Sequence, residues 1–199
     1  GKMGMPSIHA GSVFAAAAFG LAGLHGAAQA ESYVFDTRRT EVRFFYVMGL
    51  AKQKGHFGQV NGTLQYDDGK LDQSRVTATI ATSSLSTGEP FVDDELKGSD
   101  FFNVAVAPAM TFKSRSVRAT GDDTAEMTGD ITLNGITRPI TFEVSLRPHS
   151  DPALKYSAGA RQFKATGSVK RSDFNMVAYQ TMVGDTVDLE IDAIVRKKR

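Results

Sequence analysis

The sequence predicts an all-β fold, an antiparallel meander of about eight strands with one short helix. Three observations predict it: apolar and polar residues alternate along most of the chain, turn-forming residues separate the alternating segments, and one segment, 91–97, has helical spacing. The expected strands lie at about residues 42–48, 64–66, 75–80, 110–114, 127–133, 140–146, 163–169 and 187–193.

Each expected strand has one apolar and one mixed or polar face. In the first, Phe44, Tyr46 and Met48 alternate with Arg43 and Phe45, and the later segments repeat the pattern. Because successive side chains of a strand point to opposite sides, the apolar residues of each strand lie on one face. We expect these faces to form one common buried side.

Turn signals stand between the strands. Asp67-Asp68-Gly69-Lys70, 121–123 and Asn134-Gly135 are typical of hairpin connections. Eight strands in this order remove their free edges by closing into a barrel, and a two-sheet sandwich is the alternative that alternation alone leaves open.

The long crossover, residues 82–108, interrupts the strands. Val92 and Leu96 are four residues apart and acidic residues gather near the start of 91–97, which predicts a short helix. The following loop carries Phe101 and Phe102, which indicate either a plug over the barrel end or an apolar mouth.

The N-terminus predicts secretion. Lys2 precedes an apolar run, 13–24, and Ala28-Gln29-Ala30 fits the small-x-small pattern of a signal peptidase site. We expect residues 1–30 to be a secretory signal peptide and residues 31–199 to form one barrel domain. The absence of cysteine favours a bacterial periplasm as its location.

Composition excludes several classes of function. The formal net charge of +1 gives no field to recruit nucleic acid, so we expect no nucleic-acid partner. The chain has no cysteine and four histidines without metal-ligand spacing, so we expect no metal site and no bound cofactor. No serine-hydrolase elbow or phosphate-binding glycine loop is present, and the residues support an apolar binding protein without catalytic residues, not an enzyme.

The apolar face mixes large and small side chains. Small residues such as Gly62, Ala78, Gly129 and Gly167 either leave room for a slender ligand or relieve crowding where strands bend. Both interpretations remain open at this point, as does a secreted barrel whose core is filled by its own side chains.

Several segments together resemble the YceI-like family. They are "YVFDTRRTEVRF", "GHFGQVNGTLQYDDG", "TGEPFVDDE", "LKGSDFFNVAVAPAMTFKS", "MTGDITLNGITRPITFEV", "KRSDFNM" and "VGDTVDLEIDAIV", which span nearly all of the chain after residue 31. The resemblance implies an eight-stranded antiparallel lipocalin-like barrel with a helix near one end. Its lumen would hold a long polyisoprenoid lipid, such as a polyprenyl pyrophosphate or a ubiquinone.

The resemblance also implies a role and partners. The protein would carry, store or sequester the lipid in the periplasm, in isoprenoid transport or a stress response, as a monomer or homodimer. The alternative is a quinone-dependent redox partner or enzyme working with a membrane quinone enzyme or cytochrome. Arg38 and Arg39 stand where the family shows a D-x-x-H-S motif, and they either pair with an anionic headgroup or face solvent.

The candidate ligand-binding residues are inward-facing apolar side chains of the expected strands, of the crossover and of the segment after residue 170. They are Phe44, Tyr46, Met48, Leu64, Val76, Ile80, Leu96, Phe101, Phe102, Phe112, Met127, Ile131, Phe142, Val144, Phe163, Met176, Leu189 and Ile191.

Overall fold

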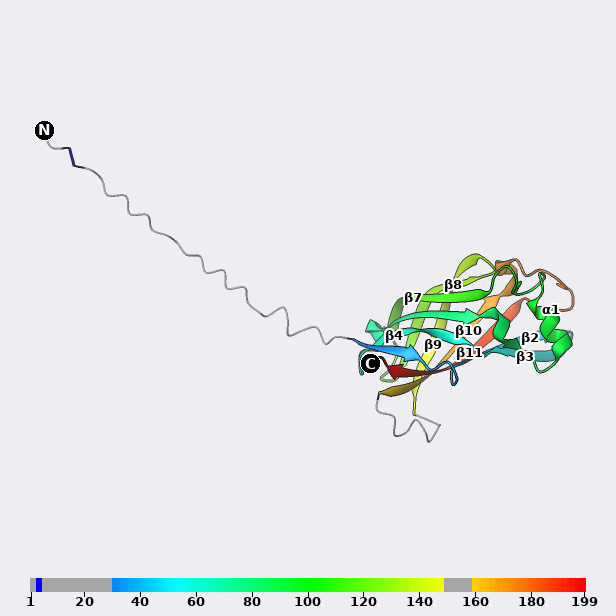
Figure 1. The fold of residues 1–199 in the computed structure, drawn as a ribbon, viewed down its shortest axis with the longest axis horizontal. Helices are drawn as coiled ribbons and strands as arrows, with labels where there is room; N and C mark the ends of the chain where they lie inside the picture. Colours follow the sequence, from blue (N-terminus) through cyan, green and yellow to red (C-terminus); the bar gives the residue numbers. More distant parts are fainter. Residues whose placement is uncertain (1–2, 5–29, 149–158) are drawn as a thin grey trace.

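The computed structural model describes residues 3–4, 30–148 and 159–199, and the last two ranges form a barrel of long antiparallel strands (Figure 1). The strands are β1 (Glu31–Phe35), β2 (Glu41–Met48), β3 (Ala51–Phe57), β4 (Val60–Tyr66), β5 (Arg75–Ala81), β6 (Leu85–Ser86), β7 (Ala109–Ala119), β8 (Thr124–Leu133), β9 (Ile136–Arg147), β10 (Ala160–Lys170) and β11 (Thr186–Lys197). The helix α1 (Pro90–Lys97) and the 3-10 turns η2 (Leu71–Gln73), η3 (Thr82–Ser84) and η4 (Arg171–Phe174) complete the described fold.

The barrel is closed. Around the ring the strands follow the order β1-β4-β5-β7-β8-β9-β10-β11, and β11 pairs with β1 again. Farther along, β11 also pairs with β2, and β2 with β3, so β1 and β2 occupy one position in the wall and β3 and β4 the next. The predicted eight-stranded antiparallel barrel is therefore confirmed over the two-sheet sandwich.

Two full strands were not predicted. The β3 segment, AKQKGHF, is polar at most positions, and β1 has only five residues. β1 and β2 are the two parts of one long interrupted strand, and β3 and β4 are the two parts of the next. Such an interruption leaves a short or polar part in which the alternation is hard to recognise.

The predicted helix is confirmed as α1, which begins one residue earlier, at Pro90. Proline suits the first turn because its missing N–H would have no helical partner there. The Asp93 carboxylate accepts hydrogen bonds from the backbone N–H and the hydroxyl of Thr87, at 2.7 and 2.6 Å. Leu96 is the residue of α1 that is buried, so the helix is anchored to the barrel end by this side chain.

The predicted hairpin at Asn134-Gly135 joins β8 and β9. Both residues have positive φ, 52° and 73°, as a two-residue type I′ turn requires. Leu133 and Ile136 pair directly across it.

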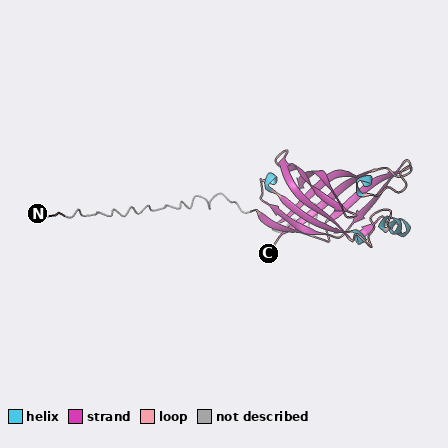
Figure 2. Cartoon of the chain, turned by 90° about the horizontal axis from the view of Figure 1, so that it is seen from above, coloured by secondary structure: helices cyan, strands magenta, loops and turns pink. Residues whose placement is uncertain are grey.

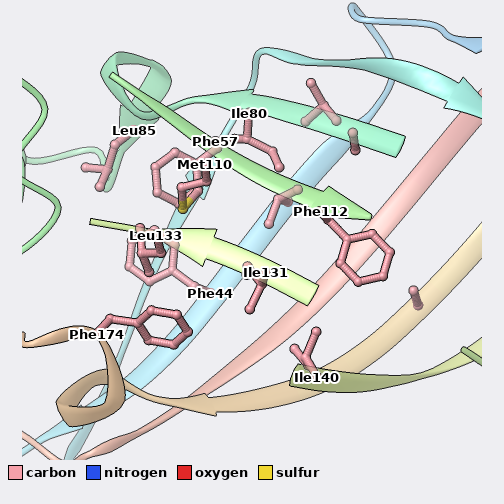
Figure 3. Close-up of a cluster of buried hydrophobic side chains, with 14 of the residues drawn as sticks. Phe44, Phe57, Ile80, Leu85, Met110, Phe112, Ile131, Leu133, Ile140 and Phe174 are labelled. Atoms are coloured by element: carbon pink, nitrogen blue, oxygen red, sulfur yellow. The ribbon is translucent and has the colours of Figure 1, made fainter. Parts of the chain in front are cut away.

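Figure 2 shows the barrel from above, with the helix α1 at the end remote from the N-terminus. Two clusters of buried side chains lie inside it. The larger one includes Phe44, Phe57, Leu96 and Phe174, and Figure 3 shows part of it. The smaller one joins Tyr33, Tyr66, Leu71 and Phe163. Leu71 is the buried residue of η2, and it ties this turn to the smaller cluster.

Part of the C-terminal basic run belongs to the barrel wall. Arg196 Nε lies 3.0 Å from the Asp36 carboxylate, and Lys197 Nζ lies 2.9 Å from that of Glu31. These two side chains are therefore paired with carboxylates. The predicted signal peptide, residues 1–30, lies outside the described residues apart from residues 3, 4 and 30.

Candidate functional site

An apolar lumen runs inside the barrel, with a volume of about 170 Å³. Side chains from every position of the wall line it, and among them only Thr40, Ser74 and Arg171 are polar. The Thr40 hydroxyl is bonded to the backbone of Ile194. The lumen therefore offers a hydrocarbon surface, which binds through burial of apolar area and not through directed polar contacts.

Inner-face glycines are covered by aromatic rings. The Phe44 ring lies over Gly55, and added Cβ atoms would come within 2.6 Å of Phe112 at Gly129 and 2.9 Å of Phe142 at Gly167. Such packing of a ring over a glycine on a neighbouring strand stabilises sheets. These glycines position the rings and do not themselves leave empty space. Four alanines do border the lumen: Ala78, Ala125, Ala165 and Ala193.

The lumen is narrow. Its 170 Å³ is close to the size of an engineered protein cavity that accepts one benzene molecule. A long chain therefore fits only when side chains move. Met110, Met127 and Met176 are flexible side chains in the lining that can adapt in this way.

A second cavity, the mouth, opens at the α1 end with a volume of about 430 Å³. Residues of β2, β3, α1 and the segment 176–183 surround it. Five residues line both cavities: Phe44, Phe102, Arg171, Met176 and Val187. We call the boundary formed by these residues the neck.

The crossover loop supplies the aromatic part of the neck. The Phe102 ring packs against those of Phe57 and Phe44, with centroids 5.1 and 5.7 Å apart. Phe101 is buried and stacks on Tyr179 at 6.1 Å. The apolar stretch between the helix and β7 thus separates the lumen from the mouth and walls the mouth itself.

Arg171 is the charged residue of the neck and is 5% exposed. Its guanidinium donates to the backbone carbonyl oxygens of Met176 (2.6 Å), Val183 (2.9 Å) and Gly184 (3.1 Å). These bonds fix the segment 176–184 to the barrel, because carbonyls far apart in that segment share one donor group. We call this arrangement the arginine clip.

A second contact holds the C-terminal end of the segment 176–184. The Asp185 carboxylate accepts hydrogen bonds from the Ser172 hydroxyl (2.7 Å) and backbone N–H (2.9 Å). These bonds, chiefly that from the hydroxyl, hold the pKa of Asp185 below its usual value despite partial burial.

The structure brings the predicted ligand-binding residues together around the two cavities. Tyr46, Met48, Leu96 and Phe101 line the mouth, and the other predicted side chains all line the lumen, with Phe44, Phe102 and Met176 shared. The prediction omitted lining residues on β3, η2 and η4, such as Phe57, Leu71 and Phe174. Arg171 was omitted because a charged residue carries no apolar signal.

Arg38 and Arg39 line neither cavity. They lie in the turn between β1 and β2, where Arg39 Nη1 is 3.1 Å from the Asp36 carboxylate. Within the described residues, no group of three or more His, Cys, Asp or Glu side chains is placed to hold a metal ion. None of the described helices is long and apolar enough to cross a membrane.

A family model described as "YceI-like domain" matches residues 33–195. Protein YceI of Escherichia coli is 35% identical over 144 residues, which is 72% of this chain and 74% of that protein. A UPF0312 protein of Ectopseudomonas mendocina is 31% identical over 182 residues, 89% of this chain and 94% of the relative.

Solved structures share the fold. BcnA of Burkholderia cenocepacia has a TM-score of 0.72 at 21% identity, covering 80% of this chain and 98% of that one. A domain of Saccharophagus degradans, described as a polyisoprenoid binding domain implicated in plant cell wall breakdown, has a TM-score of 0.65 at 13% identity, covering 84% and 99%.

Proposed function

The chain belongs to the YceI-like family, and from this premise we propose that it is a non-enzymatic carrier that binds a long-chain polyisoprenoid in the barrel lumen. The observation that carries the proposal is the continuity of an almost wholly apolar lumen with a wider mouth across a neck. The lipid-binding description of a protein with the same fold supports the ligand class.

Burial of the chain supplies the affinity. Each methylene removed from water contributes about 0.8 kcal/mol, so one five-carbon isoprene unit contributes about 4 kcal/mol. Association costs about 4–15 kcal/mol, which a few buried units offset. The tail therefore dominates binding, and the headgroup lies in the mouth, where Gln53, Glu95 and Tyr179 add polar atoms to the lining.

The proposed setting is the periplasm, where a water-insoluble lipid needs a carrier. Transport, storage and sequestration all use the same site, and the identity of the headgroup distinguishes the partners. A bound quinone would favour work with a membrane quinone enzyme or cytochrome, whereas a bound polyprenyl pyrophosphate would favour transport for the cell envelope.

Native mass spectrometry of protein purified from its own periplasm, followed by organic extraction, tests the proposal. We expect one prenyl lipid per barrel. A protein that is empty and also takes up no added geranylgeraniol would contradict it and leave a barrel with a filled core.

A matched pair of variants locates the site. Ala78 lines the lumen, and its neighbour Thr79 on the same strand is exposed. We expect Ala78→Phe to abolish uptake of geranylgeraniol and Thr79→Phe to preserve it, with circular dichroism confirming that both fold. Uptake by a folded Ala78→Phe protein would place the ligand elsewhere.

A further inference from the structure

Exposed apolar side chains gather around the mouth. Among the described residues, the large hydrophobic side chains that are exposed are Met3, Val34, Val47, Met48, Leu50, Phe91, Val106, Val177, Tyr179 and Met182. All except Met3, Val34 and Val106 belong to the end of β2 and the β2–β3 turn, to α1 or to the segment 177–182. We call these seven residues the mouth rim.

Hydrogen bonds and a β-bridge join the three segments of the rim. Gly49 donates its N–H to the Met182 carbonyl at 2.8 Å, and Met48 forms an isolated bridge with Val183. The Tyr179 hydroxyl donates to the Glu95 carboxylate of α1 at 3.2 Å. Figure 1 shows α1 and the β2–β3 end together at the end of the barrel remote from the C-terminus. The rim is therefore one continuous feature around the opening of the lumen.

The rim protrudes. Leu50, in the β2–β3 turn, is 106% exposed, as much as in an extended chain. Phe91, on α1, is 84% exposed. Single exposed apolar residues are normal, but a group of them around a cavity indicates an interaction site. Apolar side chains that protrude around a cavity can insert into a partner surface that deforms around them.

We propose that the mouth rim docks onto the surface of a phospholipid bilayer, inserting Leu50, Phe91 and Met182, so that lipid passes between bilayer and lumen without crossing water. This inference rests on the proposed function, because a prenyl ligand resides in a bilayer before it is bound. Four residues of the rim also line the mouth, so docking places this cavity directly against the lipid. They are Met48, Phe91, Tyr179 and Met182.

Charges around the rim are mixed. On β3, just after Leu50, Lys52 and Lys54 are exposed, and Lys52 Nζ lies 4.6 Å from the centroid of the Phe45 ring. On α1, Asp94 and Glu95 are exposed. Docking therefore depends on insertion of apolar side chains into the interface and not on anionic lipids. Tyrosine is enriched at membrane interfaces, which suits Tyr179.

Flotation with vesicles of phosphatidylcholine alone tests the docking. We expect the wild-type protein to float, at low and at high salt alike, since apolar insertion is not screened. The triple variant Leu50→Ser, Phe91→Ser, Met182→Ser should stay in solution. The double variant Val34→Ser, Val106→Ser removes exposed apolar side chains outside the rim and should float as the wild type does.

Transfer of geranylgeraniol separates docking from binding. From vesicles, the triple variant should load at least about tenfold more slowly than the wild type, because three inserted side chains are lost. Loading from a cyclodextrin complex measures binding alone. The double variant Leu50→Ser, Val177→Ser changes exposed rim residues that line neither cavity, so it should load more slowly than the wild type from vesicles but at the wild-type rate from cyclodextrin. Equal flotation, or equal transfer from vesicles, by the wild type and the triple variant would overturn the docking proposal.

Two other results have distinct meanings. Failure of the wild type to load from cyclodextrin would overturn the carrier function, while flotation would still decide the docking. A wild-type dimer in light scattering that the triple substitution separates, together with no flotation, would show that the rim covers a second copy and would overturn docking on lipid.

Discussion

The ring of Phe44 lies directly over Gly55 on the neighbouring strand, and a Cβ atom at position 55 would overlap it. Phe57 and Phe102 contact the same ring, with centroids 5.4 and 5.7 Å away. The position of this neck residue is thus set by a residue without a side chain.

We expect Gly55→Ala to displace the Phe44 ring and lower the free energy of unfolding by about 1–3 kcal/mol, the usual cost of overpacking. Urea unfolding measures it. Gly58→Ala is the control, because a Cβ at Gly58 would meet nothing within 4 Å. An unchanged urea midpoint in Gly55→Ala would show that the ring moves aside at no cost.

Phe102→Ala should widen the neck. Loss of the ring contacts with Phe44 and Phe57 costs about 0.5–1.5 kcal/mol for each pair, and a barrier lowered by about 1 kcal/mol speeds passage about fivefold. Stopped-flow uptake of a fluorescent prenyl probe from cyclodextrin measures the rate. Val106→Ala, an exposed position on the same loop, should load at the wild-type rate. Slower loading by Phe102→Ala would show that Phe102 guides the chain and does not obstruct it.

Arg171→Met should destabilise the mouth side of the barrel. Three backbone carbonyls lose a charged donor, and we expect the free energy of unfolding to fall by about 3 kcal/mol or more. Urea unfolding of Lys170→Met, which changes the exposed neighbouring cation, is the control. A similar loss in both variants would assign the effect to general charge and not to the arginine clip.

Asp68 links the turn before η2 to β10. Arg161 donates to its carboxylate at 3.1 and 2.7 Å, and this holds the pKa of Asp68 below its usual value against the opposing effect of burial. Because the pKa is lower in the folded state, the pair stabilises above about pH 4, and this is lost as the pH falls through the folded-state pKa.

Asp68→Asn should therefore cost at most about 1 kcal/mol at neutral pH, since the carboxylate is largely exposed, and should flatten the loss of stability in acid. Urea midpoints measured from about pH 7 to about pH 3 test this. The exposed Asp100→Asn should keep the wild-type slope, and an equally steep acid loss in Asp68→Asn would exclude the pair as its cause.

Ionisation of Tyr66 should lower the stability of the barrel at alkaline pH. Burial and the neighbouring Asp68 carboxylate raise the pKa of Tyr66 to about 12. The unfolded chain ionises first, near pH 10, so this stabilisation is full below about pH 10 and is lost as the pH rises through about 12. The difference in tyrosinate absorbance between wild type and Tyr66→Phe should rise near pH 12, and a rise near pH 10 would contradict the burial of the hydroxyl.

Much of the fold was readable from local patterns. Alternation placed eight of the strands, β2, β4, β5 and β7 to β11, and helical spacing placed α1, because period two and period 3.6 are properties of neighbouring residues. The same alternation selected the inward side chains, from Phe44 to Ile191, that line the lumen or the mouth. It failed at β3, where Lys52 and Lys54 face out at a polar strand end.

The sequence by itself thus determined where the strands run and that their common face is apolar, whereas only the tertiary structure decided how that face closes and opens. Closure depends on β11 meeting both β1 and β2, and the neck depends on Phe102 reaching Phe57 and on Arg171 gathering three carbonyls. Those contacts join residues distant in the chain, and their register follows from packing that no local pattern encodes.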